Sequence, residues 1–248
     1  MNQTIQLLKE HKSSRSYTDE PVSDEMINEI VEAARCGASS MNGQQISLIV
    51  IKDQKTRDAI AEISWGQPWI SKAPVFILVV VDFNRTALAV KKAGETQVVQ
   101  DTLEGYTVGA VDAGITLCSL MTAARALGLG VVPIGALRND SQRLVDLLKL
   151  PPLTFPMVGV CIGHIKNPAH TKPKMPVEGY RHDEYYHEDA IMPAIDAYDQ
   201  TLMEYWQSVN RPDGQSWSKN TAGYYKEEFF PATFPVALKQ GFLGKHFK

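Results

Sequence analysis

The chain reads VFILVVV from Val75 to Val81, a run of seven apolar residues that has no helical period. Five of the seven are β-branched, and a short run of this kind predicts a strand that is buried on both faces of a sheet. ISLIVI from Ile46 to Ile51 has the same character. MVGVCIG from Met157 to Gly163, and a segment that begins with VVPIG at Val131, predict two further strands.

Helical spacing surrounds these runs. Apolar residues recur at helical intervals from Ile5 to Leu8 and from Met26 to Ala34, and Ser23 is a typical N-cap for the second helix. Another helix is expected from Ser141 to Leu150. Because helices and strands mix without strict strand–helix–strand alternation, the pattern favours an α+β fold. No repeat or flexible linker is visible, so residues 1–248 are predicted to form a single domain.

The segment from Gln97 to Leu127 is rich in Ala, Gly and Thr and carries apolar residues on most of its faces. Such a pattern predicts a buried helix. Its small residues, such as Gly105 and Gly109, allow close approach by another helix, either within the subunit or across a dimer. The most apolar part, Val108 to Leu120, contains Asp112 and is shorter than the about 20 residues that a membrane span needs.

Composition excludes several classes of protein. The 248 residues are 44% hydrophobic, which suits a large buried core, and the net charge of −3 gives no field for binding nucleic acid or an anionic membrane. The three cysteines, Cys36, Cys118 and Cys161, form no disulfide framework or CxxC motif, and the last two are expected in the interior. Without a visible secretory signal at the N-terminus, the chain is predicted to be cytoplasmic.

Several catalytic motifs fail on inspection. Gly128-Leu129-Gly130 runs from a helix into a strand, whereas a dinucleotide-binding loop runs from a strand into a helix. The chain contains neither a P-loop nor a GxSxG elbow. The cluster from His182 to Asp189 has no usual zinc spacing and is interpreted as a solvated loop, so no metal site is predicted.

The turn HKSSRSY from His11 to Tyr17 is the strongest chemical signal. Arg15 offers a planar fork, Lys12 a point charge and Ser13 a hydroxyl, and together they could hold a phosphate monoester. Taken alone, the turn has an alternative interpretation as a solvated polar connection between two helices.

Four further motifs follow this turn along the chain, and their combination decides between these interpretations. After HKSSRSYTDEPVSDE at 11–25, they are the Ser39-Ser40 turn with Gln44, VDFNR at 81–85, LGLGVVPIGALRND at 127–140 and KPKMP at 172–176. Together these motifs resemble the FMN-dependent nitroreductase family, and most closely its NADPH-preferring, oxygen-insensitive nitroreductase and flavin reductase branch.

The resemblance implies an α+β nitroreductase-like fold with a central, mostly antiparallel sheet flanked by helices. It also implies an intertwined homodimer with one FMN in each of two pockets at the interface. The aromatic-rich segment 194–248 would then form a C-terminal arm that packs on the partner subunit.

The resemblance also assigns roles to residues. His11, Lys12, Ser13 and Arg15 would hold the phosphate and ribityl chain of FMN, with Lys172 and Lys174 as further cations. Ser39, Ser40 and Gln44 would contribute to the cofactor site, the two serines from the other subunit. Gln67 would bind the pyrimidine part of the ring, although it could instead be a surface residue, and Pro133, Ile134 and Gly135 would line the isoalloxazine.

Two departures from the family pattern concern binding strength and the choice of nicotinamide. Lys12 and Lys174 stand where arginine is common, and lysine keeps the charge but loses the bidentate fork. Close relatives carry an arginine cluster in the tail, whereas this tail offers Arg211, so a preference for NADPH over NADH is left open.

The activity expected from the resemblance is two-electron, ping-pong reduction of nitroaromatics, quinones or flavins by NAD(P)H, with no dedicated catalytic side chain. One alternative is a flavin reductase that supplies reduced FMN to another enzyme. A second is a flavin-binding or redox-sensing protein without turnover, and a third is an interaction protein without flavin.

Overall fold

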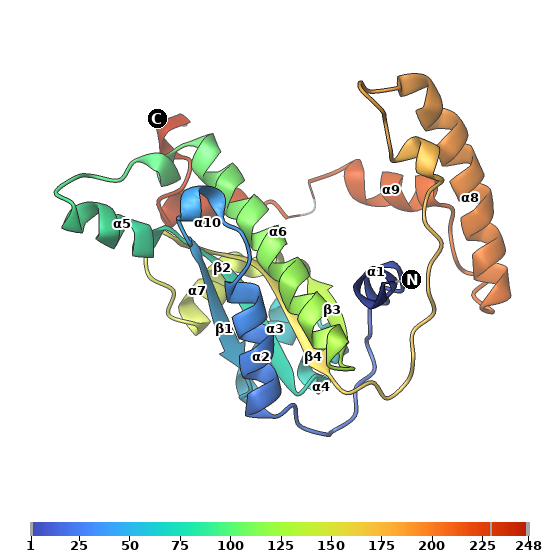
Figure 1. The fold of residues 1–248 in the computed structure, drawn as a ribbon, viewed down its shortest axis with the longest axis horizontal. Coiled ribbons are helices and arrows are strands. Elements are labelled where there is room, and N and C mark those ends of the chain that lie inside the picture. The colour runs from blue at the N-terminus through green and yellow to red at the C-terminus, as the bar shows by residue number, and fades with distance from the viewer. Residues whose placement is uncertain (1, 229, 247–248) are drawn as a thin grey trace. The chain divides into compact units, whose positions relative to one another are not determined.

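The computed structural model describes residues 2–228 and 230–246 (Figure 1). The chain divides into two compact units, one of residues 1–169 and 230–248 and the other of residues 170–229. The strands are β1 (Ile46–Ile51), β2 (Val75–Asp82), β3 (Gly130–Ile134) and β4 (Thr154–Gly163). The helices are α1 (Gln3–Lys9), α2 (Asp24–Arg35), α3 (Gln54–Ile63), α4 (Pro68–Lys72), α5 (Phe83–Lys92), α6 (Leu103–Ala126), α7 (Ser141–Leu147), α8 (Ile191–Ser208), α9 (Trp217–Tyr225) and α10 (Thr233–Lys239).

The four strands form one sheet in the order β1-β2-β4-β3, and every pair of neighbours is antiparallel. All four predicted strands are therefore confirmed, as is the antiparallel character of the sheet. β2 lies in the interior of the sheet, and its residues alternate between two apolar layers. Val75, Ile77 and Val79 face the layer that contains residues of α2 and α6, whereas Phe76 and Leu78 face the layer that contains residues of α3. Figure 1 shows α2 and α6 crossing one face of the sheet.

The long helix differs from the prediction in length and in burial. It runs from Leu103 to Ala126 rather than across the whole of 97–127, and Thr102 caps its first turn by accepting from Gly105 N at 3.2 Å. Length and composition alone would allow it to cross a membrane, although its buried side packs on the sheet as in a core helix.

Only one side of α6 is buried, so the prediction of a fully buried helix is wrong for the single chain. Val111, Ile115 and Cys118 recur at helical spacing on the opposite side, and all three are exposed. The expectation that Cys118 is an interior residue is therefore also wrong, whereas Cys161 is fully buried. The physical reason is that one chain supplies a packing partner for only one side of this helix.

The segment after residue 230 returns to the first unit and completes its core. Gln240 is buried, and its side chain donates to Pro151 O at 3.1 Å and to Thr154 O at 2.9 Å. Phe242 packs edge-on against Phe83 and Phe155, with ring centroids 5.9 and 6.1 Å away. These contacts cover the start of β4, at Thr154 and Phe155, with the residues that follow α10.

The second unit is built around α8 and α9. The Asp199 carboxylate accepts from Ser218 N at 2.9 Å, and the Tyr198 hydroxyl donates to Pro173 O at 3.0 Å. The Tyr198 and Trp217 rings lie 6.3 Å apart. The predictions of a single domain over 1–248 and of an arm that begins at residue 194 stay predictions.

Candidate functional site

The basic turn is fixed to the edge of the sheet next to β3. Ser13 forms a parallel bridge with Val131, and Ser14 N donates to Val131 O at 2.9 Å. The buried Tyr17 hydroxyl donates to Ser14 O at 2.6 Å, and burial raises the pKa of this phenol well above its usual value, so it stays a neutral donor. The turn is thus held to the sheet by its backbone and by Tyr17, and Lys12 and Arg15 are exposed.

Those side chains are accessible. Lys12 and Arg15 are exposed, and His11 and Ser13 are half-buried. The Arg15 guanidinium lies 5.4 Å from the centre of the Trp69 ring, a cation–π distance that restrains its long side chain. Two cations and a hydroxyl on a fixed backbone provide charge-assisted donors for a phosphate group.

Gln67 lies two residues before Trp69, the residue whose ring contacts Arg15 of the basic turn. Gln67 is the N-cap residue of α4, and Pro68 at the first helical position gives the helix a defined start. The Gln67 side chain is half-buried and forms no capping hydrogen bond. The Arg15–Trp69 contact therefore brings α4, and Gln67 with it, next to the basic turn.

The predicted ring-lining residues lie on β3 and just after it. β3 is an edge strand, which suits Pro133 because proline has no N–H to donate to a neighbouring strand. From Val131, which binds the basic turn, to Gly135 is four residues, or about 13 Å of extended chain. Phosphate donors and ring-lining backbone thus follow one edge of the sheet, on the scale of a ribityl phosphate chain.

Arg138 is a neighbour of this strand that the motifs did not single out. Its Nη1 donates to Met157 O at 2.8 Å, and its guanidinium lies 5.2 Å from the centre of the Phe230 ring. A Cβ added to Gly135 would come within 3.3 Å of this guanidinium. Burial lowers the pKa of Arg138 from its usual value, but an arginine remains charged at neutral pH.

A cavity of about 240 Å³ adjoins the basic turn. Lys12, Ser14 and Arg125 contribute to its wall, and Gly130 lies beside Ser14 so closely that an added Cβ would be 2.8 Å from the Ser14 Cβ. The positive charges of Lys12 and Arg125 suit an anionic group such as the phosphate of FMN. Glu10 also lines this cavity, whereas Ser13 and Arg15 lie outside its lining. Arg125 was missed from the sequence because it looked like an ordinary cation in the last turn of a helix.

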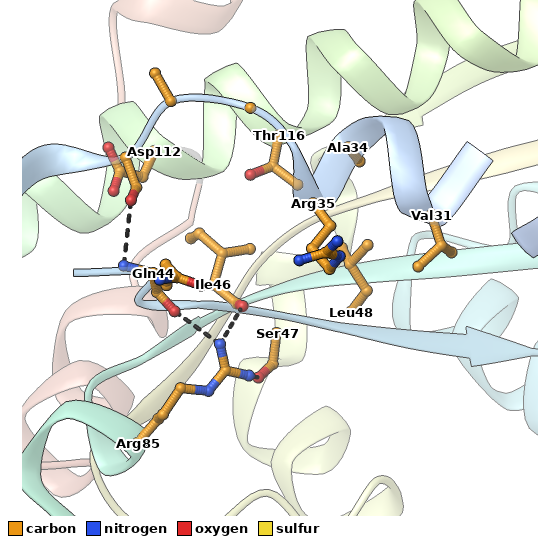
Figure 2. A pocket seen from close by; sticks show the side chains of 13 residues that line it. Val31, Ala34, Arg35, Gln44, Ile46, Ser47, Leu48, Arg85, Asp112 and Thr116 are labelled. Atoms are coloured by element: carbon orange, nitrogen blue, oxygen red, sulfur yellow. Dashed lines mark hydrogen bonds between the residues drawn. The ribbon is translucent and has the colours of Figure 1, made fainter. Parts of the chain in front are cut away.

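Ser39, Ser40 and Gln44 lie in a different place. Ser39 and Gln44 line a cavity of about 310 Å³ beside β1 (Figure 2). β1 is the edge strand opposite β3, and Ile46 pairs with Val81 at the end of the sheet far from the Ser13–Val131 bridge. Within one subunit, the structure therefore does not bring these three residues together with the basic turn.

Lys172, Lys174 and Arg211 belong to the second unit. Lys172 Nζ lies 4.8 Å, and the Arg211 guanidinium 5.7 Å, from the centre of the Trp206 ring. Lys172, Trp206 and Arg211 line a cavity of about 420 Å³. Arg211 also forks onto Asp213 at 2.9 and 3.0 Å. Lys174 is exposed. The predicted roles of the two lysines with FMN and of Arg211 with NADPH stay predictions.

In residues 2–228 and 230–246, no group of three or more His, Cys, Asp or Glu side chains is arranged to hold a metal ion. The residues of the His182 cluster instead contact one another, with the His182 and Tyr186 rings 4.5 Å apart.

Comparison with known proteins adds independent information. The sequence model of the nitroreductase family matches residues 8–164, and the sequence model of the C-terminal domain of that family matches residues 172–245. An FMN reductase [NAD(P)H] of Bacillus subtilis is 42% identical over 98% of both chains. An NADPH-flavin oxidoreductase of Vibrio harveyi is 31% identical over 97% of this chain and 98% of its own. The solved structure of NfrA2 of B. megaterium, 38% identical, matches with a TM-score of 0.95 over 98% of both chains.

Proposed function

The chain belongs to the nitroreductase family, and from its site we propose that it is an FMN-dependent NAD(P)H oxidoreductase that reduces nitroaromatics, quinones or free flavins. The observation that carries the proposal is the attachment of the basic turn to Val131, which aligns phosphate donors with the β3 edge. The names of the Bacillus and Vibrio relatives support both the flavin and the nicotinamide.

The side chains of the basic turn would bind the cofactor by its phosphate. Arg15 and Lys12 supply positive charge, and Ser13 supplies a hydroxyl donor. His11 and Gln67 would contact the ribityl chain and the pyrimidine edge. When bound, FMN supplies the redox chemistry, accepting two electrons from NAD(P)H and passing them to a second substrate.

The protein would also orient the flavin ring and favour an anionic cofactor. The backbone from Pro133 to Gly135 would line one edge of the ring, and the positive charge of Lys12 and Arg15 favours an anionic ligand. No side chain needs to act as a dedicated acid or base, because water can supply the protons.

Two related functions are distinguished by substrate. Flavin reduction is favoured by the names of the two relatives, which both describe flavin reductases, whereas nitroaromatic reduction rests on family membership. The salt bridge of Arg211 with Asp213 leaves less charge for a 2′-phosphate, so use of both NADH and NADPH is expected.

A visible spectrum followed by anaerobic addition of NADPH or NADH tests the function directly. The purified protein should carry about one FMN per subunit, and either nicotinamide should bleach the flavin band within the mixing time of the experiment. Turnover of free FMN against nitrofurazone then ranks the acceptors. A flavin that stays oxidised with both donors would indicate a binding or sensing protein, and a preparation that cannot be loaded with FMN would contradict the proposal.

We propose that the protein is a homodimer, and the exposed apolar side of α6 supports this proposal. Val111 is 55% and Ile115 36% exposed on a 24-residue helix that contacts all four strands of the sheet. A second copy would cover this apolar side and would bring Ser39 and Ser40 toward the partner's cofactor. In this proposal the part of the predicted 194–248 arm that precedes residue 230 packs on the partner subunit, and the location is cytoplasmic. Residues 230–243 instead pack in the first unit of their own chain, so the predicted arm is too long at its C-terminal end.

Val111→Glu should convert the dimer to a monomer, because it places a charge in the centre of the proposed interface. Sedimentation measures the change in mass. Leu147→Glu, on α7, is the matched control and should remain dimeric. A dimer that survives Val111→Glu unchanged would rule out the α6 side as the interface.

Thiol labelling provides a second readout of this interface. Cys118 lies one turn beyond Ile115 on the same side of α6, so it should react slowly in the dimer and rapidly in Val111→Glu. Cys36 is exposed and should react rapidly in both. Burial raises the pKa of the Cys161 thiol well above its ordinary value, so it should react only in unfolded protein. Equal Cys118 rates in both proteins would contradict the proposed interface.

A further inference from the structure

The turn from Ser39 to Gln45 has a strained backbone. Met41, Asn42 and Gln44 have φ of 51°, 54° and 50°, in the left-handed region that is unfavourable for residues with a side chain. The Met41 side chain at the tip is 97% exposed, so burial of the tip itself does not stabilise the conformation. Strain of this kind persists only where surrounding contacts hold it, and it is concentrated at functional sites.

Asp112 holds one side of this turn. It lies in the middle of α6 and is 2% exposed. Its carboxylate accepts from Ser40 N at 3.1 Å and from Gln45 Nε2 at 2.6 Å. A buried carboxylate in an apolar helix is unfavourable unless it is hydrogen-bonded. Here the donors come from the turn, so the acid links the turn to the helix.

Arg85 holds the opposite side. Its Nη1 donates to the carbonyls of Gln44 at 2.7 Å and Ile46 at 3.1 Å, and its Nη2 donates to Ser47 Oγ at 2.7 Å. Figure 2 shows this guanidinium reaching the start of β1 from the side away from Asp112. The two charged groups therefore hold the turn from its two sides.

The interior of the turn is equally specific. Ser39 Oγ accepts from Gln44 N at 3.2 Å and closes the loop on itself. The Gln45 side chain, 3% exposed, passes beneath Gly43 so closely that a Cβ at Gly43 would overlap its Oε1. The side chain that bonds to Asp112 thus depends on a glycine two residues earlier.

We propose that Asp112 and Arg85 are positioning residues that hold the Ser39–Gln45 turn in the conformation in which it contacts the FMN of the partner subunit. This inference rests on the proposed function. A turn that is already ordered loses little entropy on binding, so a fixed turn binds more tightly than a flexible one. The strained backbone is then the conformation needed for contact and not a by-product of folding.

The first test is the FMN affinity of Asp112→Asn, measured by titrating apoprotein with FMN and following flavin fluorescence. Asparagine keeps one acceptor oxygen and replaces the other by an NH₂ group, so it can no longer accept from both Ser40 N and Gln45 Nε2 and loses one of these hydrogen bonds. The dissociation constant should rise by about tenfold to a hundredfold, as expected for loss of a hydrogen bond to a charged group. Asp112→Asn combined with Gln45→Glu reverses donor and acceptor and should restore most of the affinity.

A double-mutant cycle separates positioning from a merely structural role. Ser40→Ala removes the hydroxyl but keeps the N–H that Asp112 binds, and it should weaken FMN binding by about threefold to tenfold in the otherwise unchanged protein. In the Asp112→Asn background the same change should have almost no effect, because the turn is no longer in place. Equal effects in both backgrounds, or none in the unchanged protein, would overturn the inference.

The matched control is Asp146→Asn on α7. Its exposed carboxylate also accepts from a glutamine, Gln142 Nε2 at 2.8 Å, and its replacement should leave FMN affinity unchanged. The outcomes also separate the two proposals. An unchanged protein that binds no FMN contradicts the proposed function, whereas one that binds FMN as tightly after Asp112→Asn contradicts only the positioning role.

Discussion

Replacing Lys12 and Arg15 together by alanine should weaken FMN binding by roughly 100-fold to 10,000-fold. Each change removes a charge-assisted contact that is worth about 1.5–3 kcal/mol, and each factor of ten corresponds to about 1.4 kcal/mol. Arg15→Ala also removes the contact with the Trp69 ring. Titration of apoprotein with FMN measures the dissociation constant.

Lys55→Ala combined with Arg143→Ala is the control for this pair. These residues lie on α3 and α7, and Arg143 bonds to Glu62 at 2.6 Å rather than to the site. Their removal should leave FMN affinity unchanged while altering the net charge by the same amount. Equal affinities in the two double variants would show that the phosphate is bound elsewhere.

Phe76→Ala should lower the free energy of unfolding by about 3–5 kcal/mol, the range measured when a buried aromatic side chain is truncated. Phe76 is fully buried on β2, and its ring fills the space above Gly159, where an added Cβ would lie 2.1 Å from Cζ. Gly159 has no side chain that could fill this space, so the change leaves a cavity. Urea denaturation of apoprotein at fixed concentration measures the loss.

Leu147→Ala, on the surface of α7, should change the free energy of unfolding by less than about 1 kcal/mol. The urea midpoint of Phe76→Ala should fall with little change in slope. A loss below about 1 kcal/mol in Phe76→Ala would mean that the two apolar layers of the sheet repack around the gap.

The sheet could be predicted because its signal is local. Uninterrupted apolar runs such as Val75–Val81 fit a strand buried on both faces, and the structure confirms each of the four runs. The N-cap of α2 could also be predicted from the sequence, and Ser23 Oγ accepts from Met26 N as expected. The residues of the basic turn could also be identified from their local sequence. Its attachment to Val131 could not, because this contact joins residues more than a hundred positions apart.

The features that the sequence did not predict depend on contacts between residues that are far apart along the chain. Asp112 was visible in the sequence only as a charge that disfavours a membrane helix, since its donors lie about seventy residues away. Arg85, Trp69 and Arg138 act through carbonyls or aromatic faces that no spacing rule identifies. The apolar character of the exposed side of α6 predicts burial, because it indicates that this side needs a packing partner but does not indicate whether the partner belongs to the same chain.

The return of residues 230–243 to the first unit affects how the protein is made. Phe242 and Gln240 seal the end of β4, so the apolar surface around Phe83 and Phe155 stays open until the ribosome has synthesised almost the entire described chain. Domains completed early can fold during translation, whereas this core must wait for residues 230–243. Between the synthesis of Phe155 and that of Phe242, the nascent chain therefore leaves this aromatic surface uncovered, and exposed apolar surface of this kind favours aggregation.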